Sequence, residues 1–262
     1  QAHDDVEATI RQSLEDPGVF AQVDDQAQIE MLMLAFKYEE NKYKVLGPFV
    51  RKSLSLTEEN FKTLFEALVQ SKPETANFNF SFEETEETEQ DYMPFMKEIE
   101  ASYSFTDYHL ISTQDIGKID HAQNITTYQP AYYRLFEKLH HDTFKHDVMT
   151  AEEIIESLDS HNKLFIFMSE GLLKGYLYLQ VFENTKKAEI KYFSSHTDYR
   201  FMGIAFDLLS YALQYTFSNY DVDKIYFKIR SKNNTLVERF HELGFNINYE
   251  YKKFKYVAAH IG

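Results

Sequence analysis

A turn between a predicted strand and a predicted helix is the part of the chain best suited to bind an anion. Residues 188–194 have the alternating pattern of a β-strand, and an amphipathic helix is predicted from Phe206 onward. The turn contains Gly203, which allows close backbone approach, and the small Ala205. A helix that begins after such a turn presents unpaired backbone N–H groups, and its dipole favours negative charge. The segment therefore predicts a seat for a phosphate or pyrophosphate.

Two motifs resemble those of the GNAT N-acetyltransferase superfamily. Arg200, Gly203 and Ala205 fit that family's acyl-CoA signature, R/Q-x-x-G-x-G/A. A second segment is similar to the family helix N-x-x-A-x-x-L-Y-x-K-x-G-F. The residues that agree with this second motif are Asn233, Gly244 and Phe245. The residues that depart from it are Leu236, Arg239, Phe240 and Glu242.

The resemblance implies an α/β (α+β) fold: a mixed, largely antiparallel twisted sheet flanked by helices. In such a fold two central parallel strands part after the phosphate turn, here residues 189–195 and 224–230. Acetyl-CoA is then the implied cosubstrate, with its pantetheine arm between the parted strands and its pyrophosphate on the amides of the turn. The residues expected to contact it are Phe193, Ser194, Ser195, Arg200, Phe201, Met202, Gly203, Ile204, Ala205, Asn233 and Phe240.

The implied reaction is direct acetyl transfer from acetyl-CoA to a primary amine. An alkyl amine has a pKa of about 10 and arrives protonated, so a base must take its proton. Glu189 is the first candidate, because a carboxylate on this strand often works through water in the family. Strand alternation predicts that Glu189, Lys191 and Phe193 share one face. The alternative that Glu189 faces solvent or pairs with Lys191 remains equally open.

Histidines and tyrosines supply the other candidates for proton transfer. His141, or its neighbour His140, lies where the family lines its acceptor site, and His196 precedes the phosphate turn. Most histidines on helix surfaces have no catalytic role. Phe240 stands where many GNAT enzymes have a tyrosine that reprotonates the departing thiolate, and phenylalanine has no proton to give. CoA can still leave as a thiolate, because a thiol pKa is about 8.5. The tyrosines nearby in sequence are Tyr192, Tyr211 and Tyr226, and none can be assigned this role from the sequence.

The negative charge of the chain lies in its first half. Residues 1–117 hold 9 Lys and Arg against 24 Asp and Glu, whereas residues 118–262 hold 18 of each. An acidic surface repels phosphate backbones, so we expect no nucleic-acid partner. It can attract a cationic acceptor, although a solvated acidic surface that keeps the protein soluble is the simpler interpretation.

The apolar pattern of the first half recurs about 145 residues later, which indicates two related domains. The first copy is expected as helix 4–14, strands 19–24, 29–38 and 43–50, helix 59–69, strand 77–82, helix 91–101 and strand 105–112. The second is expected as helix 151–158, strands 163–169, 172–182 and 188–194, helix 206–217, strand 225–230, helix 233–242 and strand 245–251. An acidic surface loop is expected at residues 83–90.

The first copy lacks two features of the second. It has no counterpart of the strand and helix expected over residues 125–145, and its segment 52–57 contains no glycine. Thr57 is instead a predicted helix N-cap, followed by Glu58 and Glu59, which would repel a phosphate. We therefore predict a degenerate GNAT-like domain over residues 1–115 and an acetyltransferase domain with the acyl-CoA site over residues 116–262.

Composition narrows the remaining possibilities. The chain has no cysteine, which excludes disulfides and thiolate chemistry and suits a cytoplasmic protein. It has no apolar run long enough to span a membrane and no recognisable metal motif. We expect a small-molecule or peptide amine as acceptor, no metal, no membrane partner, and a monomer or homodimer.

Two other functions stay open. Phe240 and the acidic first half also suit a non-catalytic acyl-CoA-binding or protein-interaction module. The tandem arrangement also resembles the peptidoglycan-building aminoacyl-tRNA transferases, but those need a tRNA-binding surface, and the sequence has no basic stripe to provide one.

Overall fold

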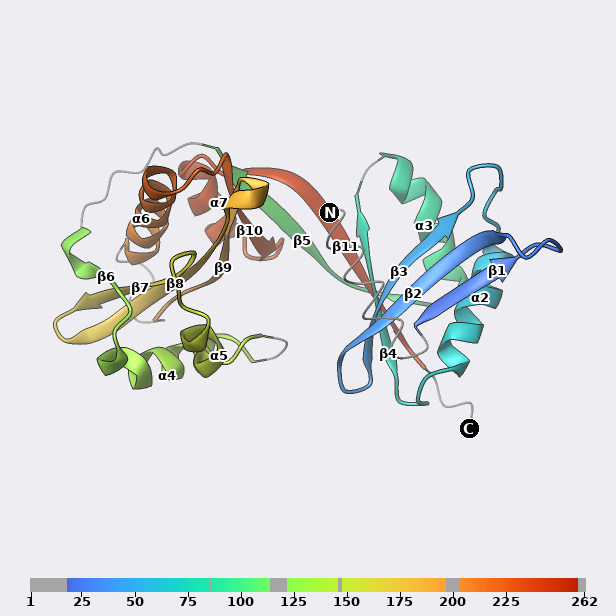
Figure 1. The fold of residues 1–262 in the computed structure, drawn as a ribbon, viewed down its shortest axis with the longest axis horizontal. Coiled ribbons are helices and arrows are strands. Elements are labelled where there is room, and N and C mark those ends of the chain that lie inside the picture. The colour runs from blue at the N-terminus through green and yellow to red at the C-terminus, as the bar shows by residue number, and fades with distance from the viewer. Residues whose placement is uncertain (1–17, 85, 114–121, 146–147, 197–202, 259–262) are drawn as a thin grey trace. The chain divides into compact units, whose positions relative to one another are not determined.

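The computed structural model describes residues 18–84, 86–113, 122–145, 148–196 and 203–258 (Figure 1). The chain forms two compact units: unit 1 contains residues 1–107 and 250–262, and unit 2 contains residues 108–249. Strands β5 (Ser102–Ser112) and β11 (Asn246–Val257) each contribute to both units. The units therefore do not follow the expected division at residue 115, because the end of the chain returns to unit 1.

Unit 1 is a sheet covered by two helices. Its elements are β1 (Val19–Val23), β2 (Ile29–Glu39), β3 (Lys42–Val50), α2 (Glu58–Gln70), β4 (Asn77–Glu83) and α3 (Glu86–Glu98). The strand order is β1-β2-β3-β4-β11, and only β3 and β4 run parallel among these neighbours. Alternate residues of β2, Met31, Met33 and Ala35, join the side chains of both helices in one apolar core.

Two expectations for unit 1 have different outcomes. Thr57 is the N-cap of α2, as predicted: its side chain accepts a hydrogen bond from the Asn60 amide at 3.1 Å. The acidic loop expected over residues 83–90 is wrong, because α3 begins at Glu86. Glutamate favours helix formation, and acidic residues in a first turn complement the helix dipole. The helix expected over residues 4–14 lies outside the described residues.

The strands of unit 2 are also of mixed direction. Its elements are β6 (Ile125–Thr127), α4 (Tyr133–Thr143), α5 (Ala151–Glu156), β7 (Asn162–Ser169), β8 (Leu172–Phe182), β9 (Lys187–Ser195), α6 (Ile204–Asn219), β10 (Lys224–Arg230) and α7 (Asn234–Glu242). The strand order is β5-β10-β9-β8-β7-β6. From β6 to β9 all neighbours are antiparallel, and β9 and β10 are parallel. The expected mixed, largely antiparallel sheet flanked by helices is confirmed.

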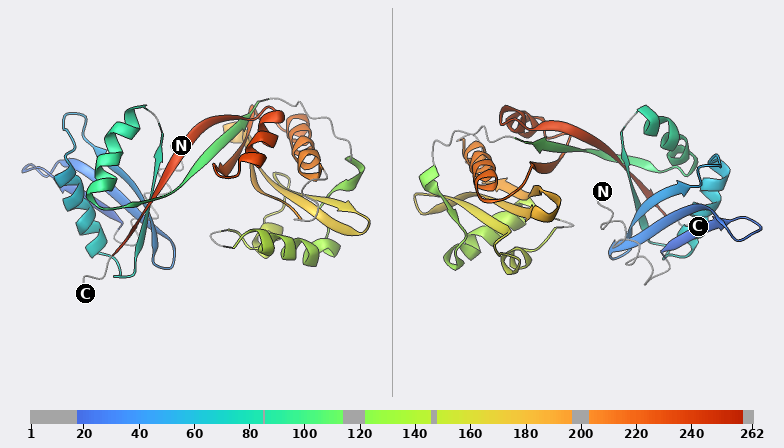
Figure 2. Two further views of the ribbon diagram at one scale, coloured as in Figure 1. Left: turned by 180° about the vertical axis from the view of Figure 1, so that it is seen from behind. Right: turned by 45° about the horizontal axis from the view of Figure 1, so that its top comes forward.

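Helices cover both faces of the sheet of unit 2. Figures 1 and 2 show α6 and α7 on one face and α4 and α5 on the other. Strand β8 alternates between them: Leu177 and Leu179 belong to the core beneath α6, whereas Tyr176 and Tyr178 belong to the core beneath α4 and α5. None of the described helices is long and apolar enough to cross a membrane.

Candidate functional site

The two parallel strands of unit 2 part midway along their length. Pairing between β9 and β10 runs from Lys187 opposite Lys224 to Ile190 opposite Phe227 and ends there. Both strands continue, β9 to Ser195 and β10 to Arg230. On its other edge β9 stays paired with β8 up to Ser195. The segment 193–195 therefore has one backbone edge that β10 does not cover, at the position expected for a pantetheine arm.

The helix that follows begins at a glycine with a left-handed backbone. Gly203 has φ 75° and ψ 3°, and no side chain caps α6 at this residue. A Cβ atom at Gly203 would meet no atom within 4 Å, so the backbone conformation, not crowding, requires glycine there. The side chain of Ile204, the first residue of α6, is buried in the core. Arg200, Phe201 and Met202 lie outside the described residues.

Gly175 of β8 determines how close α6 lies to the sheet, and it was missed in the sequence. A Cβ atom at Gly175 would come within 3.1 Å of Ile204 Cγ2, Leu208 Cδ1 and the Ser194 carbonyl oxygen. Glycine at this position lets the first turn of α6 pack directly on β8 beside the end of β9. A lone glycine within a strand pattern often marks such a close approach, so a signal was present.

A β-bulge in β9 decides which side chains share a face. Tyr192 lies opposite Tyr178, but Ile190 lies opposite Leu179, so Lys191 is an additional residue in the strand. Phe193 packs in the core beneath α6, whereas Tyr192 packs in the core beneath α4 and α5. The expectation of one face shared by Glu189, Lys191 and Phe193 is therefore wrong, because the bulge shifts the alternation by one residue.

Glu189 lies on the face that carries α4 and α5. It is opposite Gln180 of β8, whose side-chain amide donates to the Tyr178 hydroxyl at 3.1 Å on that face. From β10, the Tyr226 hydroxyl donates to Glu189 Oε2 at 2.9 Å. Glu189 is only partly buried, so its second carboxylate oxygen can accept from a water or an amine.

Of the two neighbouring histidines of α4, His140 points into the protein and His141 is exposed. His140 Nε2 lies 2.7 Å from the Met149 carbonyl oxygen, and Nδ1 lies 2.5 Å from the Tyr176 hydroxyl. Because a carbonyl only accepts, Nε2 carries the proton, and Nδ1 of the neutral ring accepts from Tyr176. Burial lowers the pKa of His140, although the Met149 carbonyl opposes this effect. Burial also raises the pKa of Tyr176 well above its usual value.

Two further hydrogen bonds tie the end of α4 and the segment that follows it to β9. The Met149 amide donates to the Tyr192 hydroxyl at 2.9 Å. Thr143 Oγ1 lies 2.6 Å from Ser194 Oγ and also donates to the Leu139 carbonyl. Since Thr143 has one hydroxyl proton, Ser194 is the donor in their pair. The side chain of Ser194 is thus engaged with Thr143.

The two expected contacts from α7 lie in different surroundings. Asn233 is the N-cap of α7, is exposed and makes no capping hydrogen bond with its side chain. Phe240 is fully buried and stacks on Phe227, with ring centroids 4.6 Å apart and planes inclined by 7°. Phe245 meets the same ring edge-on at 4.9 Å. Phe240 therefore helps to form the wall of β10 at the point where β9 and β10 separate.

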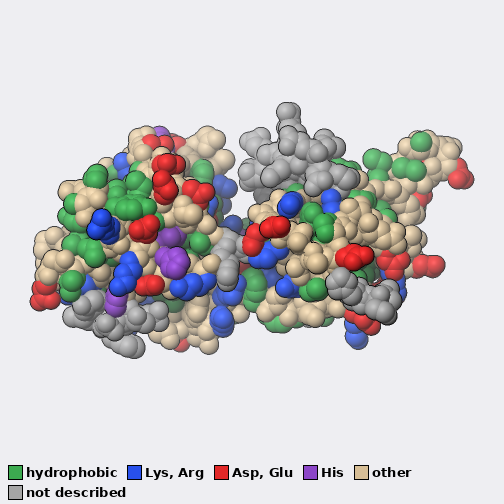
Figure 3. Space-filling view, turned by 90° about the horizontal axis from the view of Figure 1, so that it is seen from below, with side chains coloured by type: hydrophobic (Ala, Val, Ile, Leu, Met, Phe, Trp, Pro, Cys, Tyr) green, Lys and Arg blue, Asp and Glu red, His purple; other side chains and the backbone are tan. Residues whose placement is uncertain are grey.

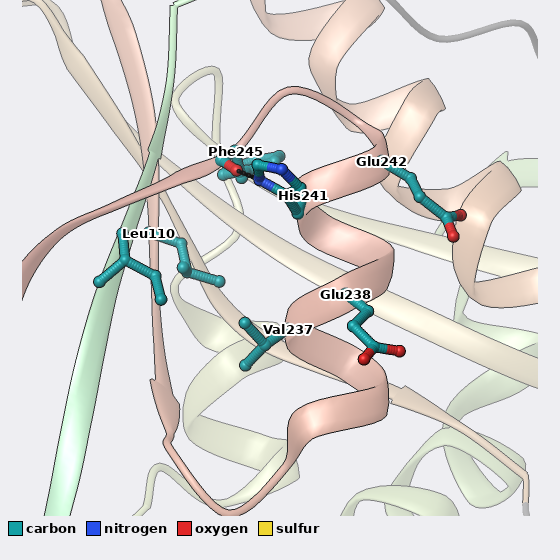
Figure 4. Close-up of a pocket in the computed structure, with 7 residues that line it drawn as sticks. Leu110, Val237, Glu238, His241, Glu242 and Phe245 are labelled. Carbon is teal, nitrogen blue, oxygen red and sulfur yellow. Dashed lines mark hydrogen bonds between the residues drawn. The ribbon is translucent and has the colours of Figure 1, made fainter.

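A separate cavity lies beside α7. It has a volume of about 390 Å³ and is mostly apolar, with Leu110, Val237 and Phe245 among its lining residues. Figure 4 shows Val237 pointing toward Leu110, whereas Glu238 and Glu242 point away from it on the other side of the helix. Its lining includes none of the residues expected to bind the cosubstrate or perform the reaction.

The described residues contain no group of three or more His, Cys, Asp or Glu that could hold a metal ion. The face seen in Figure 3 carries acidic, basic and histidine side chains that are interspersed.

Comparisons with known proteins agree with this architecture. Residues 110–261 match a family model described as an acetyltransferase (GNAT) domain. A GCN5-related N-acetyltransferase from Sphaerobacter thermophilus aligns over 91% of this chain and 80% of its own, with 13% identity and a TM-score of 0.65. A tandem GNAT protein from the clavulanic acid biosynthesis pathway aligns over 91% and 82%, with 12% identity and a TM-score of 0.61.

A third similar structure is a GCN5-related glucosamine N-acetyltransferase region in a fungal multi-domain GH3 β-N-acetylglucosaminidase. It aligns over 97% of this chain and 36% of its own, with 13% identity and a TM-score of 0.70. At these identities the likeness shows the fold. A search of curated protein sequences gave no match.

Proposed function

Because the chain belongs to the GNAT acetyltransferase family, we propose that it transfers an acetyl group from acetyl-CoA to a primary amine. One observation carries the proposal: β9 and β10 part after Ile190 and Phe227, next to a helix that begins at the left-handed Gly203. Parted strands offer backbone groups to the two amides of pantetheine, and the start of α6 offers N–H groups and a positive dipole end to the pyrophosphate.

The residues proposed to hold acetyl-CoA follow from this placement. The backbone of residues 193–195 would pair with pantetheine, and the amides of residues 200–205 would bind the pyrophosphate. Asn233 is proposed to contact the cosubstrate, since its side chain is exposed and makes no capping hydrogen bond. Phe240, behind Phe227, would give the separated strands an apolar wall.

Glu189 is the proposed base. In the transfer, the amine nitrogen forms a bond to the acyl carbon, the carbon–sulfur bond breaks, and its electron pair leaves with sulfur. The nitrogen loses a proton, which Glu189 would accept directly or through one water. The hydrogen bond from Tyr226 orients the carboxylate. His141 is retained as a second candidate near the acceptor side, where its exposure leaves it free to meet an amine-bearing substrate.

We further propose that unit 1 is a degenerate copy of the fold without an acyl-CoA site and that unit 2 holds the working site. Like β9 and β10, strands β3 and β4 are parallel, and they pair only from Lys42 opposite Asn77 to Val45 opposite Phe80. Beyond that point β3 contains Pro48, which has no backbone N–H to donate to a ligand. Thr57 caps α2, and Glu58 and Glu59 follow in its first turn. Thr57 therefore occupies one amide of this helix start, and the two carboxylates repel a phosphate.

The same proposal includes a small-molecule or peptide amine as acceptor and no nucleic-acid partner. It also includes a cytoplasmic location and a monomeric or homodimeric state. The alternative is a non-catalytic acyl-CoA-binding or interaction module. Phe240 supports this alternative, because the ring on α7 has no proton to give a departing thiolate.

A turnover assay separates the two functions. The purified protein would be incubated with acetyl-CoA and single amines, among them putrescine, lysine, glucosamine and a peptide with a free N-terminus, while release of free thiol is recorded. Turnover that falls at least tenfold in Glu189→Gln, but not in the exposed α7 variant Glu238→Gln, supports the proposal. Acetyl-CoA binding without turnover of any amine favours the binding module.

A further inference from the structure

We propose that Tyr192 is the acid that protonates the departing CoA sulfur and that it works with Glu189 as an acid–base pair on one face of β9. This inference rests on the proposed function. It supplies the proton donor that Phe240 cannot provide.

The bulge at Lys191 creates the pair. Residues three positions apart on a regular strand point to opposite faces. In β9, however, Glu189 lies opposite Gln180 and Tyr192 lies opposite Tyr178, and these two β8 residues are joined by a side-chain hydrogen bond of 3.1 Å. Glu189 and Tyr192 therefore share the face beneath α4 and α5. The negative charge of Glu189 acts on the Tyr192 hydroxyl, where it raises the pKa.

Tyr192 is also at the correct point along the strand. It is the second residue after Ile190, the last residue of β9 that pairs with β10. The next residue, Phe193, belongs to the backbone segment proposed to pair with the pantetheine arm, which carries the sulfur. A side chain that leaves the strand at Tyr192 begins one residue from that segment and extends toward the side of α4 and α5.

The Tyr192 hydroxyl is arranged to donate a proton. Its oxygen accepts from the Met149 amide at 2.9 Å, and Met149 is held in turn by His140 through its carbonyl. Among the described residues, no acceptor for the hydroxyl proton lies within hydrogen-bond distance. The ring is 8% exposed and stacks on Tyr178 at 6.1 Å, which fixes its direction.

The surroundings keep this phenol protonated at neutral pH. Burial is the largest influence and raises the pKa of Tyr192, the Met149 amide lowers it, and the charges of Glu189 and Glu153 raise it. From β8 the hydroxyls of Tyr176 and Tyr178 face the same core, and from α4 the neutral His140 does so. No cation among these groups would draw the proton from Tyr192.

The other two nearby tyrosines are used elsewhere. The Tyr226 hydroxyl donates to Glu189. Tyr211 belongs to α6 and packs edge-on against Phe165 at 5.1 Å, in the core on the opposite face of the sheet.

The proton balance closes within the pair. Glu189 takes one proton from the attacking amine, the bond between carbon and sulfur breaks with its electrons on sulfur, and Tyr192 gives its proton to that sulfur. The proton on Glu189 then passes to the tyrosinate through water, which restores both groups. The net reaction converts an amine and acetyl-CoA into an amide and CoA with a free thiol.

The test compares two ligands that differ only at sulfur. The protein is labelled with 3-fluorotyrosine, the ¹⁹F signal of Tyr192 is assigned with Tyr192→Phe, and that of Tyr178 with Tyr178→Phe. Titration with CoA should shift the Tyr192 signal clearly more than titration with desulfo-CoA, and the Tyr178 signal should respond equally to both.

The outcomes distinguish failure of this inference from failure of the proposed acetyltransferase function. If CoA binds and the Tyr192 signal responds equally to both ligands, Tyr192 does not meet the sulfur and the inference is wrong, while the proposed function stands. If CoA does not bind, both fall. With any amine that is turned over, Tyr192→Phe should lower kcat by about 10²-fold with little change in the KM for acetyl-CoA. Tyr178→Phe should retain both.

Discussion

Gly175 of β8 lies directly against Ile204, the first residue of α6. A Cβ atom at Gly175 would come within 3.1 Å of Ile204 Cγ2, which is tighter than an ordinary van der Waals contact. The contact sets the height of the α6 N-terminus above the sheet. It therefore sets the position of the amides proposed to bind the pyrophosphate.

Gly175→Ala should lower both stability and CoA affinity, because the added methyl group pushes the first turn of α6 away from β8. Overpacking of this kind costs about 1–3 kcal/mol in the free energy of unfolding. Urea denaturation and calorimetric titration with CoA measure the two effects. The cost should be smaller in a Leu208→Ala background, since Leu208 Cδ1 lies 3.1 Å from the same Cβ position. An equal cost in both backgrounds would show that crowding is not the cause.

His140→Gln should destabilise the protein in a pH-dependent way. Burial lowers the pKa of His140 in the folded state, so the unfolded chain binds the proton more readily. The contribution of His140 is complete above about pH 6.5 and is lost as the pH falls toward the lower folded-state pKa. We expect a loss of about 1–3 kcal/mol at pH 7.5 that shrinks as the pH falls to 5. Denaturation across this range checks it, and a difference that stays constant with pH would contradict it.

Ser194 and Thr143 should be energetically coupled. A double-mutant cycle with Ser194→Ala and Thr143→Val should give a coupling of about 0.5–1.5 kcal/mol, because each substitution removes the 2.6 Å hydrogen bond between the two side chains. CoA affinity should change by less than about threefold in Ser194→Ala, since the Ser194 hydroxyl is already engaged by Thr143. A large loss of affinity would mean that the hydroxyl itself meets the cosubstrate.

Thr57→Ala should weaken unit 1 without affecting the cosubstrate. Loss of the cap on α2 costs about 0.5–2 kcal/mol, measurable by thermal or urea unfolding. CoA affinity and stoichiometry should stay as in the unchanged protein. If stoichiometry falls, the start of α2 binds the cosubstrate and unit 1 carries a site after all.

The sequence predicted the elements of the site better than the contacts between them. Turn chemistry and alternation are local, so Gly203, the two parallel strands and the Thr57 cap could be recognised from their own neighbours. The bulge at Lys191 could not, because it is defined by which β8 residue lies opposite each β9 residue. The orientation of His140 depends in the same way on a carbonyl nine residues away and on Tyr176 of β8.

The ends of the chain show the same limit. In unit 1, β11 pairs with β4, with Tyr251 opposite Glu83 and Val257 opposite Asn77. Nothing in the local sequence of β11 indicates a partner about 170 residues away. Removing residues 1–115 would also remove Tyr108–Ser112 from unit 2, and it would remove β4, the partner of β11. Point substitutions are therefore a better way than truncation to test the role of each unit.

Calorimetric titration of CoA and acetyl-CoA into the protein tests the central claim most directly, with Gly203→Glu compared with Gly171→Glu. Both glycines have a left-handed backbone, with φ 75° and φ 72°, and neither has an atom within 4 Å of its Cβ position, so the two variants carry the same local strain. Only Gly203→Glu places a carboxylate at the start of α6. The account predicts one site per chain in the unchanged protein and in Gly171→Glu, with binding lost in Gly203→Glu. Binding that survives in Gly203→Glu would contradict it.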